Sequence, residues 1–139
     1  MRHRASLLTA ALWWGSLAGI GFIAVPLLFA WMPAPALAGQ IAARLFSVQC
    51  WVSLACGALM LILLKGRAAS ARDDGARAAM LLAALAMLLA LLVEYAAAPH
   101  IRAHDRLALW HTVGSAMYVL QWLCVAAVLW RLSSKECKT

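Results

Sequence analysis

Four long runs of apolar residues follow one another along the chain, separated by short polar segments. The runs cover residues 5–31, 41–64, 78–98 and 107–130. Each exceeds the roughly 20 residues that an α-helix needs to cross a hydrocarbon core about 30 Å thick. Because the bilayer core offers no water to satisfy backbone N–H and C=O groups, such runs must be helical. The pattern therefore predicts an all-α integral membrane four-helix bundle.

The composition leaves little material for a second domain. Hydrophobic residues make up 66% of the 139 residues and charged residues only 12%. We therefore expect residues 1–139 to form a single domain made of the four spans. The first run is about twice as long as the apolar region of a secretory signal, so we expect it to stay in the protein as the first helix.

The distribution of basic residues predicts the orientation. Nine of them fall in the N-terminal segment, the segment between the second and third runs, and the C-terminal tail. They are Arg2, Arg4, Lys65, Arg67, Arg72, Arg77, Arg131, Lys135 and Lys138. These segments share one side of a four-span protein, and the side rich in Lys and Arg is normally cytoplasmic. Both termini are therefore expected in the cytoplasm, with the spans in a bacterial inner membrane.

Three side chains inside the apolar runs are acidic or basic, and a charge at the bilayer centre costs about 3 kcal/mol even on the insertion scale. They are Arg44, Glu94 and His111, each three or four residues from the outer end of its run. A rise of about 1.5 Å per residue puts all three at one depth. Ser115 and Tyr118 continue the face of His111 at helical spacing. These five residues predict an outward-facing polar pocket.

Two interpretations of this layer stay open. In the first, Glu94 and His111 bind a cation or relay protons, and Arg44 keeps the carboxylate ionised. In the second, the same three side chains only lock helices together near the interface, where long side chains reach toward water. No phosphate loop, nucleophile elbow or HExxH motif accompanies the layer. We therefore expect no enzymatic activity.

The segment between the third and fourth runs supplies a second candidate site. His100 and His104 share a face if a helix extends into this segment, and Asp105 adds an oxygen ligand. Copper or zinc is the metal ion that such donors suit, and a solvated connector is the alternative. Haem is a less favoured cofactor, because His111 is the only histidine inside a run.

The first run carries two features that bear on helix packing. Pro26 has no N–H, which frees the carbonyl of Phe22 and predicts a helix kink. Gly15 and Gly19 lie four residues apart, a spacing that lets helix backbones approach closely. We expect this packing to occur within the monomer. A homo-oligomer, or contact with another membrane protein, is the alternative.

Several short motifs resemble those of the small membrane proteins grouped with transmembrane protein 205. They are Trp13-Trp14-Gly15, Pro26-Leu27-Leu28-Phe29, Ala38-Gly39 and Leu45-Phe46, together with His111 and Ser115. The chain departs from the family at Ser47, Val48 and Gln49, where proline and an aromatic residue often follow Leu-Phe. The resemblance implies a four-span membrane protein of uncharacterised role. The eukaryotic members of that family are loosely associated with handling of platinum drugs and with secretory traffic.

The leading hypothesis is a non-enzymatic membrane protein that binds or passes a small cation, with a metal ion as one candidate, through the outer polar pocket. The alternatives are a structural or partner subunit of a membrane complex, and a haem- or redox-handling membrane protein. The lipid bilayer is the expected partner. Because the net charge of +7 is spread over tails and one loop, no nucleic acid is expected.

Overall fold

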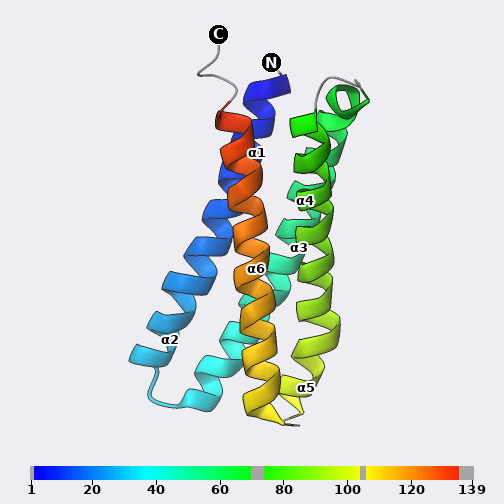
Figure 1. The fold of residues 1–139 in the computed structure, drawn as a ribbon. Helices are drawn as coiled ribbons and strands as arrows, with labels where there is room; N and C mark the ends of the chain where they lie inside the picture. Colours follow the sequence, from blue (N-terminus) through cyan, green and yellow to red (C-terminus); the bar gives the residue numbers. More distant parts are fainter. Residues whose placement is uncertain (1, 70–73, 104–105, 135–139) are drawn as a thin grey trace.

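The computed structural model describes residues 2–69, 74–103 and 106–134, and every regular element within these ranges is helical. Four helical segments are long and apolar enough to cross a membrane: Arg2–Trp31, Pro35–Ala68, Asp74–Arg102 and Leu107–Ser133. Figure 1 shows that they run roughly along one axis, side by side. The prediction of an all-helical bundle of four long apolar helices is confirmed.

Two of the four segments change helix type along their length. The first segment consists of α1 (Arg2–Ala18), the π-helix η1 (Gly19–Ala24) and α2 (Val25–Trp31). The second segment is α3 (Pro35–Ala68). The third consists of α4 (Asp74–Leu92), the π-helix η2 (Val93–Ala97) and α5 (Ala98–Arg102). The fourth is α6 (Leu107–Ser133).

The helices extend beyond the predicted apolar runs. α3 already begins at Pro35, because the fixed φ of proline and its missing N–H suit the first turn of a helix. Its last turn carries Lys65 and Arg67, whose charge is favourable at a helix C-terminus. A helix can continue through charged residues such as these, whereas a span predicted from hydropathy ends at them, so the predicted spans are shorter than the helices.

The tightly packed core lies in the half of the bundle that contains the start of α1 and the end of α6. There α1 packs against α3 and α6, and α4 packs against the same two helices. Trp13, Leu17, Met60 and Leu64 are fully buried in this half. Buried alanines bring α4 close to its neighbours. They are Ala76, Ala79, Ala83, Ala86 and Ala90.

Glycine contributes to close packing in α3 but not in α1. A Cβ at Gly57 would come within 2.4 Å of Met87 Cγ, so α3 and α4 need glycine at that crossing. At Gly15 and Gly19, by contrast, a Cβ would meet nothing within 4 Å. The prediction that these two glycines pack tightly within the monomer is therefore wrong, because they face away from the other helices.

Both π-helices end two residues before a proline. η1 ends at Ala24 and precedes Pro26, and η2 ends at Ala97 and precedes Pro99. Proline removes one helical hydrogen bond, and its ring clashes with the carbonyl four residues earlier. Those carbonyls belong to Phe22 and Tyr95, which lie inside the π-helices. The wider turn accommodates the clash, so the irregularity predicted at Pro26 takes the form of a π-helix and recurs in the third segment.

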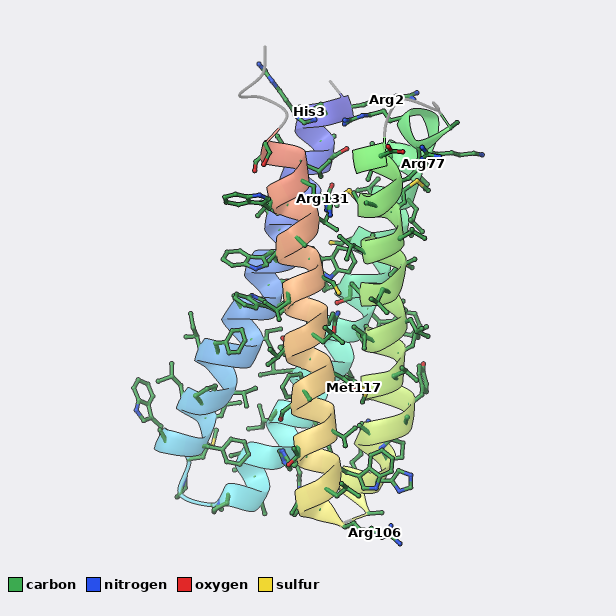
Figure 2. All side chains as sticks on the ribbon, in the orientation of Figure 1. Arg2, His3, Arg77, Arg106, Met117 and Arg131 are labelled. Atoms are coloured by element: carbon green, nitrogen blue, oxygen red, sulfur yellow. The ribbon has the colours of Figure 1, made fainter. Side chains whose placement is uncertain are left out.

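The basic side chains labelled in Figure 2 lie mostly at one end of the bundle. Arg2, Arg77 and Arg131 lie at the end where α1 begins and α6 ends, while Arg106 lies at the opposite end. At the first end Arg77 also pairs with Asp74. We call the end that carries Arg2 the basic end and the opposite one the distal end.

Candidate functional site

A cavity of about 310 Å³ lies in the distal half of the bundle. Its wall comes from all four helical segments and includes both π-helices. Apolar side chains form most of that wall: Phe22, Val25, Phe29, Phe46, Ile101 and Val119. Polar groups occupy a minority of it: Glu94, Arg102, His111, Ser115 and Tyr118.

The cavity exists because the distal part of the first segment does not pack into the core. η1 and α2 contain no buried residue. α2 packs against α3, and Figure 1 shows it lying away from α6 at the distal end. Phe22, Phe29 and Val119 line the cavity and are also 47%, 47% and 40% exposed. The cavity therefore opens sideways, between the first segment and α6, on a face that lipid chains would contact.

Glu94 places its carboxylate on the cavity wall and has two partners. Its Oε1 accepts a hydrogen bond from Ser47 Oγ at 2.9 Å and pairs with Arg102 Nη2 at 3.1 Å. The Glu94 side chain is 17% exposed and that of Arg102 is 53% exposed. The site therefore contains a half-buried carboxylate whose charge is balanced by a half-exposed guanidinium.

The sequence identified the wrong arginine as the counter-charge. Arg44 is exposed on α3 and does not line the cavity, because equal depth in the membrane does not fix the direction in which a side chain points. Arg102 was assigned to a loop, since the third helix was expected to end at residue 98. The helix instead continues through Pro99, and Arg102 lies eight residues, about two helical turns, after Glu94.

Three residues of α6 complete the polar part of the wall. His111 and Ser115 line the cavity and are exposed at its opening. Tyr118 is only 7% exposed and forms the inner end of the cavity. The structure thus places Glu94, His111, Ser115 and Tyr118 around one cavity, which Arg44 does not line.

Tyr118 is held from two sides. Its hydroxyl donates a hydrogen bond to the backbone carbonyl of Leu17 at 2.8 Å, just before η1 begins. Its ring packs edge to face against Phe46, with ring centroids 5.1 Å apart. A Cβ at Gly21 would come within 2.3 Å of Tyr118 Cε1, so glycine is needed where η1 meets this ring.

The comparisons with known proteins identify a family without a described activity. A family model, "Domain of unknown function (DUF4149)", matches residues 8–108. The chain belongs to the DUF4149 family. No curated protein and no solved structure matches it. The matched part of this DUF4149 chain contains Ser47, Glu94 and Arg102, whereas the cavity residues of α6 lie beyond it.

The second candidate site of the DUF4149 chain falls only partly within the described residues. His104 and Asp105 lie outside them. His100 belongs to α5, and its ring stacks on Trp110 with centroids 4.2 Å apart and planes inclined by 3°. Within the described ranges no group of three His, Cys, Asp or Glu residues is arranged to hold a metal ion. The metal hypothesis for this segment stays a prediction.

Proposed function

We propose that this membrane protein binds a small amphiphilic molecule that enters the cavity from the lipid bilayer. The observation that carries the proposal is the sideways opening, where Phe22, Phe29 and Val119 both line the cavity and face outward. A molecule dissolved in the hydrocarbon region reaches such a cavity without passing through water. Ligand sites of this kind are mainly apolar, with a few polar groups that fix orientation.

The size of the cavity limits the ligand. About 310 Å³ lies at the lower end of the roughly 300–1,000 Å³ that is usual for small-molecule sites. This volume suits a single chain or a small ring system better than a lipid with two chains. The remainder of a longer chain can stay in the bilayer, because the opening is lateral.

The polar end of the cavity favours a ligand that can both donate and accept hydrogen bonds. Ser47 and Arg102 both contact Oε1 of Glu94, which leaves Oε2 as an acceptor. A guanidinium has five N–H groups, and the bond to Glu94 uses only one of them. The carboxylate and the guanidinium therefore offer an acceptor beside a donor, as an ammonium–phosphate zwitterion or an amide would require.

A small cation, as predicted from the sequence, is the second candidate ligand. It is favoured by the presence of the Glu94 carboxylate and the His111 imidazole on one cavity. A cation would have to displace the guanidinium of Arg102, which already balances Glu94. Metal analysis of the purified protein before and after Glu94→Gln tests this candidate. A stoichiometric metal that is lost in the variant would replace the amphiphile proposal.

The cellular setting is part of the proposal. The bundle would lie in a bacterial inner membrane with both termini in the cytoplasm, because basic residues concentrate at the basic end. The cavity would then lie in the outer half of the bilayer. No catalytic role is proposed. The resemblance to transmembrane protein 205 fits this setting, and a partner-subunit or haem-handling role is the alternative.

Photochemical labelling tests the amphiphile proposal. The protein in lipid nanodiscs is exposed to a diazirine analogue of lysophosphatidylethanolamine, which has one chain, an ammonium and a phosphate. We expect labelled peptides from η1, α2 and the first half of α6. Ser115→Trp, which fills the opening, should reduce this labelling several-fold. Leu88→Trp, at a 51% exposed position of α4 outside the cavity wall, is the matched control. Even labelling of all lipid-facing helices in both variants would refute the proposal.

A further inference from the structure

A cluster of polar side chains lies inside the bundle, close to Tyr118. Gln49, Ser53 and Gln121 are at most 2% exposed. Gln49 Nε2 donates to Ser16 Oγ at 3.0 Å and to Ser53 Oγ at 3.4 Å, and Gln121 Nε2 donates to Ser53 Oγ at 2.9 Å. The cluster therefore links α1, α3 and α6 through side-chain hydrogen bonds.

One atom of this cluster lacks a partner. Gln49 Oε1 is buried and has no hydrogen-bond partner among the described residues. An amide oxygen accepts two hydrogen bonds in water, and burying it without any costs free energy that the other bonds of the side chain do not offset. Nearly all buried polar atoms are satisfied by protein or by ordered water. The geometry thus calls for a donor beside Gln49.

A second, much smaller cavity is lined in part by Gln49. Its volume is about 10 Å³, and its wall includes Gln49, Ser53, Gln121 and Ala90. On the same measure a single water molecule needs roughly 10–15 Å³ and two to four polar partners. Phe46, Val93 and Tyr118 line both this space and the large cavity, so these three side chains form the partition between them.

We propose that the small cavity is a binding site for one water molecule. The water donates a hydrogen bond to Gln49 Oε1 and can accept one from the hydroxyl of Ser53, whose oxygen already receives two amide N–H groups. Water fits this set better than a cation, because two N–H donors point at Ser53 and no carboxylate lines the space. The site is independent of any ligand in the large cavity.

The proposed water would join three helices. The polar side chains around it come from α3 and α6, and Gln49 extends the cluster to Ser16 of α1. The hydrated cluster is therefore a polar junction between α1, α3 and α6.

Filling the small cavity tests the proposal. Ala90→Val adds two methyl groups to its wall and removes the room for water, which would strand Gln49 Oε1. We expect the Tm of the protein in detergent to fall by several degrees. In a Gln49→Met background no amide oxygen needs a donor, so the same Ala90→Val change should lower the Tm much less or raise it.

Two outcomes would overturn the water site. A higher Tm for Ala90→Val in the native background would mean that the cavity is dry and gains from being filled. An equal loss in both backgrounds would mean that valine only clashes with its neighbours. If Gln49→Met does not fold, a high-resolution experimental map decides. A density peak within hydrogen-bond distance of Gln49 Oε1 supports the proposal, and an empty cavity or a coordinated cation refutes it.

Discussion

At the scale of residues, the polar end of the cavity depends on the carboxylate of Glu94 and on its two partners, Ser47 and Arg102. Depth along each helix follows from counting residues, so Glu94 and His111 could be assigned to one layer. The direction in which a side chain points depends on how each helix is rotated in the bundle, which no single run of residues reveals. Arg44 therefore replaced Arg102 in the predicted pair, and Ser47 was missed as a partner of Glu94.

Replacing Arg102 and Arg44 one at a time tests the observed pairing of Glu94 with Arg102. Glu94→Gln should destabilise the protein by about 0.5–1 kcal/mol, a magnitude usual for a partly exposed ion pair. The loss should shrink in an Arg102→Gln background, because the pair is already broken. In an Arg44→Gln background, which lacks an exposed charge at the same end, the loss caused by Glu94→Gln should be unchanged. Thermal unfolding of the three single and two double variants in detergent measures the coupling, and coupling of Glu94 to Arg44 alone would contradict the structure.

Two glycines of the first segment should respond oppositely to alanine. Gly21→Ala forces the ring of Tyr118 to move, and crowding of this kind costs about 1–3 kcal/mol. Gly15→Ala meets open space, and alanine is the better helix former by about 1 kcal/mol. We therefore expect a lower Tm for the first variant and an equal or higher Tm for the second. A large loss at Gly15 would show that a second chain packs there.

At the scale of elements, hydropathy predicted the number and order of the helices because each run is long enough to span a membrane. It could not show the π-helices, whose cause is local. Pro26 was recognised as an irregularity inside a helix, but Pro99 was assigned to a loop, so the parallel between the first and third segments was not visible. The contact from Tyr118 to Leu17, 101 residues apart, depends on tertiary packing alone.

Replacing Pro26 should convert the π-helix into a regular helix. Pro26→Ala restores the missing N–H, and loss of the extra residue in the turn would rotate the residues on one side by about 100°. Phe29 would then leave the cavity wall. We expect weaker labelling by the diazirine lipid and a changed reactivity of a cysteine placed at position 29. Ala30→Gly, a small change in the same helix, is the control, and unchanged labelling in Pro26→Ala would contradict this account.

At the scale of the whole molecule, the structure divides into a packed half at the basic end and an open half at the distal end. The apolar pattern indicates burial in lipid and predicts neither half, because lipid-facing and core-facing side chains are equally apolar in a membrane protein. What separates them is residue size: alanines let α4 approach its neighbours, while aromatic side chains of η1 and α2 face the cavity and the lipid.

Cysteine labelling in whole cells tests the proposed orientation. In a Cys137→Ser background, a cysteine that replaces Ala69, between α3 and α4, should react with a membrane-impermeant maleimide only after the membrane is permeabilised. A cysteine at Arg106, just before α6, should react with a membrane-impermeant maleimide in intact cells. The native Cys50, Cys56 and Cys124 are buried and should contribute little background. The reverse pattern would invert the assigned topology.

The loose attachment of the distal part of the first segment has a mechanical consequence. In the most apolar 18 residues of the first segment only 11% of the residues are buried, against 33–39% in the other three segments. No residue from Gly19 to Trp31 lies in the core. Because a segment with few buried contacts moves more easily than a packed one, we expect this stretch to move more than the packed half does. When η1 and α2 move outward, they keep their contacts with lipid and lose no core contact, but they push against the surrounding lipid. The width of the cavity should therefore depend on the lateral pressure of the bilayer.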